Sequence, residues 1–157
     1  MGENVLIIED SDVKYKAVFD VIVGAAPAAN VTRASTVIEA ESQIERIYWD
    51  LVILDISMDI APSALGPRSR GQANIGGLGV AQRMFLLERE APTIILTAFD
   101  SFSAPTIGHG DTEIVGFEEI RRRAKEFLPA SLLGCLQYSS STWKEEMRSM
   151  TKSALGL

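Results

Sequence analysis

Short runs of apolar residues alternate along this chain with longer segments in which apolar residues recur every three or four positions. The short runs are typical of buried parallel strands, and the longer segments are typical of helices with one apolar side. The alternation predicts an α/β fold with five strand–helix pairs. We expect strands at residues 5–10, 30–34, 51–55, 93–98 and 133–138, and helices at 12–25, 36–49, 78–90 and 117–128 and from about 141 onward.

The first predicted helix follows the first strand almost directly. Its apolar residues fall at helical spacing, so one side of the helix should pack against the sheet. We expect that side to consist of Val13, Ala17, Val18, Val21 and Ile22.

Two connections are unusually long, at about 57–76 and 99–116, and both are polar and contain glycine. Right-handed crossovers bring every connection that follows a strand to the same edge of a parallel sheet. Long connections of this kind are candidates for a lid or a partner surface, and disordered insertions are the alternative. The chain length of 157 residues fits a single domain, 1–157.

The composition of the chain argues against several classes of function. The 21 acidic and 15 basic residues give a formal charge of −6, which argues against a general nucleic-acid binder or a binder of anionic membranes. Cys135 is the only cysteine, so an intramolecular disulfide and a cysteine-rich zinc site are excluded. No apolar stretch approaches the roughly 20 residues that span a bilayer, and no signal peptide pattern is present. We therefore expect a cytoplasmic protein with no membrane partner.

Acidic residues stand at the ends of two predicted strands. Glu9 and Asp10 close the first strand, Asp55 closes the third, and Thr97 lies near the end of the fourth. In a doubly wound sheet of order 2-1-3-4-5 these strands are neighbours, so the four side chains should converge at the edge where such folds bind ligands. Three close carboxylates repel one another unless a cation intervenes, and hard oxygen ligands favour Mg²⁺.

With these acids in place, the chain resembles the receiver domains of two-component response regulators, which have a flavodoxin-like fold. The resemblance covers most of the chain apart from the two long connections. It rests on the order and spacing of four segments, which are VLIIED at 5–10, DLVILDISM at 50–58, Gly77-Leu78, and IILTA at 94–98.

The resemblance implies that Asp55 accepts a phosphoryl group from a histidine kinase or a phosphotransfer protein. It also implies that Glu9, Asp10, Asp55 and the backbone carbonyl of Ser57 hold Mg²⁺, and that Thr97 is a switch hydroxyl that biases a distal protein-binding face toward a downstream partner. Such a protein is a stand-alone phosphoacceptor with at most self-phosphorylation and dephosphorylation activity. It is not a conventional enzyme. A homodimer remains open.

One departure from the family is prominent. Receivers carry a lysine after the fifth strand, and the stretch from Gln137 to Thr142 has none. Charge from elsewhere could replace it, and the candidates are Lys125, Lys144, Arg68 and Arg70.

The missing lysine keeps a second hypothesis open, in which the chain is a pseudo-receiver that binds proteins without phosphorylation. A magnesium-dependent hydrolase on the same sheet is a third hypothesis. It is disfavoured because Ser57, rather than a second aspartate, stands two residues after Asp55, and no general base is evident.

Overall fold

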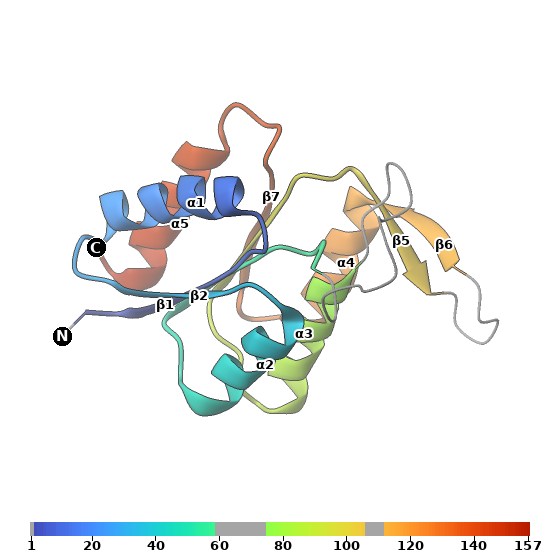
Figure 1. The fold of residues 1–157 in the computed structure, drawn as a ribbon, viewed down its shortest axis with the longest axis horizontal. Helices are drawn as coiled ribbons and strands as arrows, with labels where there is room; N and C mark the ends of the chain where they lie inside the picture. Colours follow the sequence, from blue (N-terminus) through green and yellow to red (C-terminus); the bar gives the residue numbers. More distant parts are fainter. Residues whose placement is uncertain (1, 59–74, 106–111) are drawn as a thin grey trace.

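The computed structural model describes residues 2–58, 75–105 and 112–157 (Figure 1). The strands are β1 (Asn4–Ile8), β2 (Asn30–Ala34), β3 (Leu51–Leu54), β4 (Thr93–Thr97), β5 (Ser101–Pro105), β6 (Thr112–Gly116) and β7 (Leu132–Gln137). The helices are α1 (Asp12–Ala25), α2 (Val37–Arg46), α3 (Gly76–Leu86), α4 (Phe117–Phe127) and α5 (Trp143–Leu155).

Five of the strands form one parallel sheet of order β2-β1-β3-β4-β7. The predicted order is confirmed, because β7 is the fifth strand of this sheet along the chain. Ile8 pairs in register with Leu54, and Leu54 pairs with Ile95. The carboxyl ends of β1, β3 and β4 therefore lie side by side.

Helices cover both faces of the sheet, with α1 and α5 on one face and α2, α3 and α4 on the other (Figure 1). Successive residues of β1 alternate between the two apolar clusters. Val5 and Ile7 belong to the cluster under α1 and α5, whereas Leu6 and Ile8 belong to the cluster under the other three helices. A strand buried on both faces needs apolar residues at every position, which explains the continuous run in the sequence.

The buried side of α1 differs from the prediction in one residue. Val13 is 76% exposed, and Lys14 is buried in line with Val18, Val21 and Ile22. Each helical residue advances by about 100°, so Lys14 lies about 40° from Val18 around the axis and Val13 about 140°. Placing Val13 on the buried side was therefore wrong, and a charged residue extends that side toward the end of β1.

Part of the predicted connection at 99–116 is a hairpin. β5 and β6 pair antiparallel, with Phe102 opposite Val115. Phe102, Ala104 and Val115 are buried and join the same cluster as Leu6. The expectation of one long loop missed this alternation, because the buried positions are few and lie between polar residues. Of the connection predicted at 57–76, residues 59–74 lie outside the described residues.

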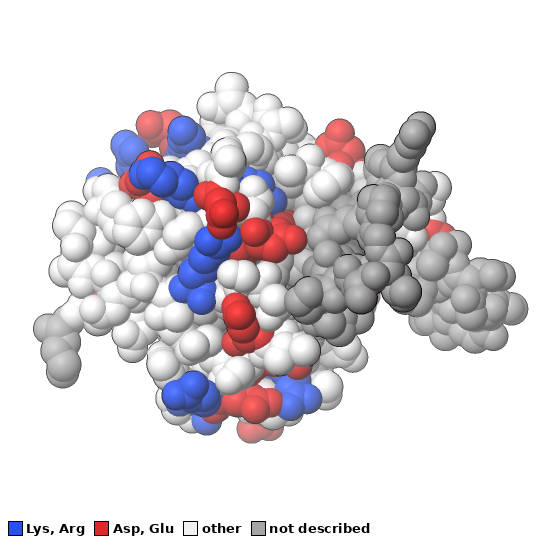
Figure 2. All heavy atoms as spheres, in the orientation of Figure 1, with Lys and Arg blue, Asp and Glu red and all other residues white. Residues whose placement is uncertain are grey.

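Within the three described segments, no helix combines the length and the apolar character needed to cross a membrane. Basic and acidic side chains lie next to one another on the face shown in Figure 2, which shows no broad field of a single sign.

Candidate functional site

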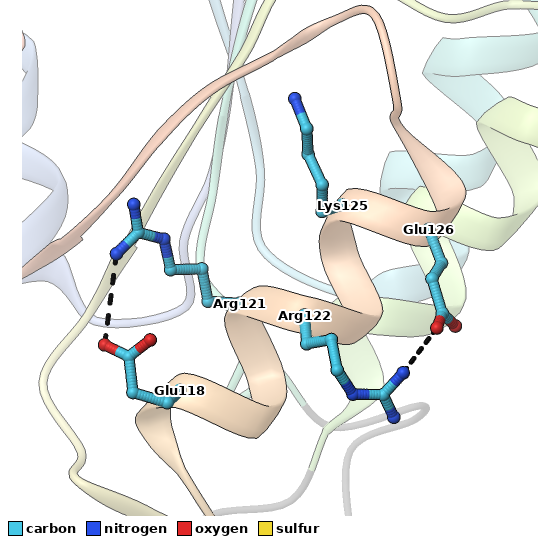
Figure 3. Close-up of a pocket in the computed structure, with 5 residues that line it drawn as sticks. All are labelled: Glu118, Arg121, Arg122, Lys125 and Glu126. Carbon is cyan, nitrogen blue, oxygen red and sulfur yellow. Dashed lines mark hydrogen bonds and ion pairs between the residues drawn. The ribbon is translucent and has the colours of Figure 1, made fainter.

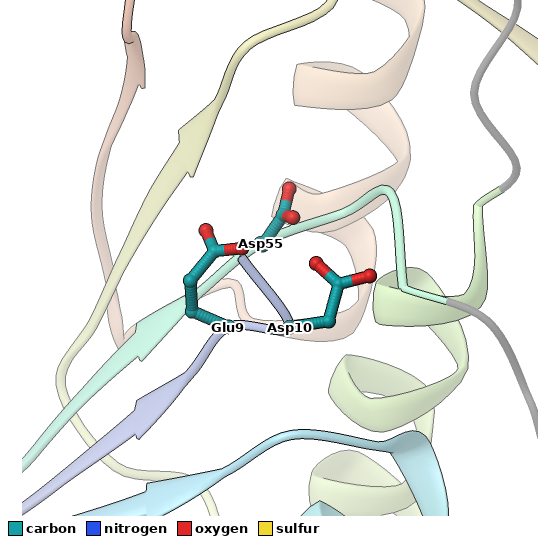
Figure 4. A group of neighbouring side chains, drawn as sticks. All are labelled: Glu9, Asp10 and Asp55. Atoms are coloured by element: carbon teal, nitrogen blue, oxygen red, sulfur yellow. The ribbon is translucent and has the colours of Figure 1, made fainter. Parts of the chain in front are cut away.

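The three predicted acids meet at the carboxyl edge of the sheet. Glu9 and Asp10 follow β1, Asp55 follows β3, and one carboxylate oxygen from each lies within 4.8 Å of the other two (Figure 4). Glu9 and Asp55 are buried, whereas Asp10 is exposed, so the group opens to solvent on one side. Carboxylate oxygens are the hard donors that Mg²⁺ prefers, and this set of donors therefore fits a magnesium ion.

The turn after β3 holds the carboxylate of Asp55 in place. The Ser57 backbone N–H donates to Asp55 Oδ1 at 3.1 Å, and the Ser57 hydroxyl lies 3.0 Å from Oδ1 and 2.9 Å from Oδ2. These contacts use the N–H and the hydroxyl of Ser57. The predicted role of its carbonyl as a metal ligand stays a prediction.

Gly77 allows α3 to begin against this same turn. Its N–H donates to the carbonyl of Ile56 at 2.9 Å. A Cβ at position 77 would lie 2.2 Å from the backbone oxygen of Asp55, which no side chain could tolerate without a shift of the backbone. The close approach of α3 to the turn that carries Asp55 thus requires glycine.

Arg33, on the neighbouring strand β2, fastens the turn after β1. Its Nε donates to the carbonyl of Glu9 at 3.1 Å, and its two terminal nitrogens donate to the carbonyl of Asp10 at 3.2 Å and to Asp12 Oδ1 at 2.8 Å. The planar guanidinium suits several acceptors at fixed angles. The Ser11 N–H also donates to Glu9 Oε2, at 3.0 Å. Arg33 therefore holds the backbone that carries the first two acids, and Ser11 holds the side chain of Glu9.

A lysine that the sequence analysis did not single out lies between two of the acids. Lys14 Nζ is 2.9 Å from Glu9 Oε1 and 3.1 Å from Asp55 Oδ2, and its side chain is only 8% exposed. Two signals in the sequence point to it. Lys14 lies one turn before Val18 on the buried side, and it lies in the first turn of a helix, where the helix dipole disfavours a cation unless acids are near.

Two of the four residues proposed to replace the missing lysine belong to the described part of the chain. Lys144 Nζ lies 5.7 Å from the centre of the Trp143 ring. Lys125 lines a hollow on α4, and Arg68 and Arg70 lie outside the described residues.

The hollow on α4 has a volume of about 370 Å³ and is lined by both acidic and basic side chains (Figure 3). Arg122 pairs with Glu126, and Arg121 lies 3.9 Å from Glu118. Since these arginines have acidic partners on the same helix, the arrangement is that of a solvated, self-compensated face.

The electrostatics of the acid pocket follow from its burial. Desolvation, together with the negative charge of Asp55, raises the pKa of Glu9 to about 8, although Lys14 acts in the opposite direction. Burial also opposes the charge of Lys14, but attraction to Asp55 and Glu9 exceeds that effect and raises the pKa of Lys14. Lys14 therefore remains an ammonium group.

Thr97 lies at the same sheet edge, at the end of β4, and is fully buried. Its hydroxyl oxygen accepts a hydrogen bond from the Phe99 N–H at 3.3 Å. Its register partner is Gln137, the last residue of β7, whose amide donates to Asp100 Oδ1 at 2.8 Å. Gln137 thus stands near the position where receivers carry a lysine, and its side chain is bound to the connection between β4 and β5.

No family model matches the chain, and no curated protein matches its sequence. Many solved structures resemble it over nearly its whole length.

One of them is the receiver domain of a sensor histidine kinase from Pseudomonas aeruginosa, with a magnesium ion coordinated in its active site cleft. It shares 18% identity and a TM-score of 0.62, and the match covers 100% of both chains. A signal receiver domain from Clostridium thermocellum has 13% identity and a TM-score of 0.68, again over 100% of both chains. A Francisella response regulator receiver domain has 15% identity and a TM-score of 0.64, over 99% of this chain and 98% of that one. The chain therefore has the fold of the receiver domains of two-component response regulators.

Proposed function

We propose that this chain is a phosphoacceptor receiver in which Asp55 takes a phosphoryl group from the phosphohistidine of a kinase or phosphotransfer protein. The observation that carries the proposal is the meeting of Asp55 with Glu9 and Asp10 at the ligand-binding edge of a receiver fold. The 157 residues act as one receiver domain. A downstream protein, or a second copy of the chain, reads the phosphorylated state.

In the proposed reaction, a carboxylate oxygen of Asp55 attacks phosphorus. The O–P bond forms as the N–P bond of the phosphohistidine breaks, and the leaving imidazole nitrogen keeps the electron pair and takes up a proton. Ser57 fixes the attacking carboxylate through its N–H and its hydroxyl. Positioning of this kind lowers the entropic part of the barrier.

The same acids would serve the metal. Glu9, Asp10, Asp55 and the carbonyl of Ser57 would hold Mg²⁺, which when bound supplies positive charge to the phosphoryl oxygens.

Thr97 would carry the signal away from Asp55. Its hydroxyl would donate to a phosphoryl oxygen, while its oxygen already accepts from the Phe99 N–H. A turn of this side chain would therefore alter the start of the β4–β5 connection, which leads into the hairpin packed on the core. Such a local change is the type of event that biases a distal face.

The test is intact-mass analysis after incubation with a small phosphodonor, with Mg²⁺ or with a chelator. The wild type should gain one phosphoryl mass in Mg²⁺ and much less in chelator, and Asp55→Asn should gain none. Asp20→Asn is the matched control, because Asp20 is an exposed acid that pairs with Lys16 on α1. An equal gain in Asp55→Asn, or no gain in the wild type, would contradict the proposal.

A second candidate function is a protein-binding module on the receiver scaffold that does not use phosphate. It is favoured by Gln137 at the end of β7 and by Lys14, which already occupies one oxygen of Asp55. This function predicts that the wild type gains no phosphoryl group even when calorimetry shows that Mg²⁺ is bound.

A further inference from the structure

Lys14 is a buried cation that the receiver fold by itself does not require at this position. Its ammonium contacts Asp55 Oδ2 at 3.1 Å and Glu9 Oε1 at 2.9 Å, and all three side chains are almost completely buried. Taking a lysine out of water costs several kcal/mol, and partners recover this only with good geometry. On α1 the lysine replaces an apolar residue on the buried side. A position with that cost points to a use for the charge.

The proposed reaction creates a need for such a charge. A phosphoryl group brings about two negative charges to a place where three acidic side chains already meet. A divalent ion offsets only part of that total. A preorganised cation close to the reacting oxygen stabilises charge that develops during transfer, and it acts most strongly where water is excluded.

We propose that Lys14 is the catalytic cation of this site, contacting the phosphoryl group on Asp55 in place of a lysine at the end of β7. The inference rests on the proposed phosphoacceptor function. It adds to that function the residue that supplies the positive charge, which is a lysine on α1, the helix that follows β1.

The geometry allows this role without movement of the backbone. Lys14 already contacts one of the two oxygens that can attack phosphorus, and its four-carbon stem lets the ammonium follow the group once it is attached. α1 is also anchored at this end, because the Ser11 side chain accepts from the Lys14 N–H at 3.3 Å. The backbone of Lys14 is therefore fixed at the start of α1, while its side chain can adjust the position of the ammonium group.

The contact with Glu9 gives the same residue a second effect. Lys14 neutralises oxygens that would otherwise be available to a cation, so it should weaken the binding of Mg²⁺ while it accelerates transfer. These two effects have opposite signs in a variant that lacks the charge. A purely structural role for Lys14 would not separate them.

The experiment compares Lys14→Gln with Lys16→Gln on the full chain. Lys16 is on the same helix, is 75% exposed, and pairs only with exposed Asp20 among the described ion pairs. The initial rate of phosphoryl gain from acetyl phosphate is measured by intact mass at saturating Mg²⁺, and the affinity for Mg²⁺ alone is measured by calorimetry. We expect Lys14→Gln to lose at least about tenfold in rate and to bind Mg²⁺ more tightly, and Lys16→Gln to match the wild type.

Two further variants separate charge from folding. Lys14→Arg keeps the positive charge and should therefore retain more of the rate than Lys14→Gln. If Lys14→Gln fails to fold, the rate of Lys14→Arg can still be compared with that of the wild type. Adding Gln137→Lys to Lys14→Gln places an ammonium beside Thr97, the register partner of position 137, and should recover part of the rate.

The outcomes are distinguishable. A wild type that gains no phosphoryl group overturns the proposed function itself. A wild type that gains it, with Lys14→Gln equally fast or faster, overturns the inference alone and makes Lys14 an inhibitory counter-ion. Loss of rate that is explained entirely by weaker Mg²⁺ binding, or no recovery with either restored charge, also overturns it.

Discussion

Replacement of Lys14 by methionine should destabilise the metal-free protein by about 3 kcal/mol. Methionine keeps most of the volume on the buried side of α1 but removes the cation between Glu9 and Asp55. Removing one partner of a buried ion pair typically costs about 3–5 kcal/mol, because it leaves an uncompensated charge. The lower value applies here, because the pKa of Glu9 is already raised to about 8 and Glu9 can take up a proton at neutral pH.

For a chain of this size, about 3 kcal/mol corresponds to a fall in the unfolding midpoint of roughly 6–12 °C. Calorimetry in chelator measures the midpoint for the wild type, Lys14→Met and the exposed control Lys16→Met. Saturating Mg²⁺ should restore much of the loss, because an ion that binds only the folded acids stabilises the folded state.

The reasoning would be refuted by a Lys14→Met midpoint within about 2 °C of the wild type in chelator, since that corresponds to less than about 1 kcal/mol. It would also be refuted if Lys16→Met fell equally. Either result would mean that the buried ion pairs of Lys14 make no specific contribution to stability.

Three further changes test other parts of the structure. Gly77→Ala should destabilise the fold and slow phosphoryl transfer, because its Cβ would lie 2.2 Å from a backbone oxygen after β3. Gly79→Ala is the control. Because position 79 has open space around it, this variant should raise the stability measured by urea unfolding by up to about 1 kcal/mol. Phe102→Ala should lower the free energy of unfolding, measured in urea, by about 3–5 kcal/mol. Ile114 is 65% exposed on the same hairpin, so Ile114→Ala should lower it much less. Equal losses would mean that the hairpin is not part of the core. Burial raises the pKa of the Cys135 thiol to about 11, so its alkylation by iodoacetamide should be slow at pH 8, accelerate as pH approaches 11, and be fast at pH 8 in urea. Fast alkylation of the native protein at pH 8 would contradict the burial.

The sheet was predictable because its strands are buried on both faces. Runs such as Val5 to Ile8 admit few other interpretations, and the parallel order then follows from the helices between them. The meeting of Glu9, Asp10 and Asp55 was predictable for the same reason, since residues that end neighbouring parallel strands share an edge.

The hairpin and Lys14 were not predicted, for a different reason in each case. Phe102, Ala104 and Val115 are buried by tertiary packing, and their short alternation is weaker than that of an independent strand pair. Lys14 was overlooked because a helix side was judged by apolar residues alone, which selected Val13. The position of Lys14 in the first turn of α1 could have pointed to it, because a buried lysine there needs acidic partners. Glu9 and Asp55 can both be partners only because the fold brings them close together.

The most direct test of the account is to locate the phosphoryl group. After reaction with acetyl phosphate in Mg²⁺, borohydride reduction converts an aspartyl phosphate to homoserine, which tandem mass spectrometry assigns to a position in the chain. The account predicts homoserine at position 55 in the wild type and a loss of that signal when Mg²⁺ is removed. Homoserine at Asp10 or another acid, or none at position 55 in a protein that has gained phosphoryl mass, would contradict it.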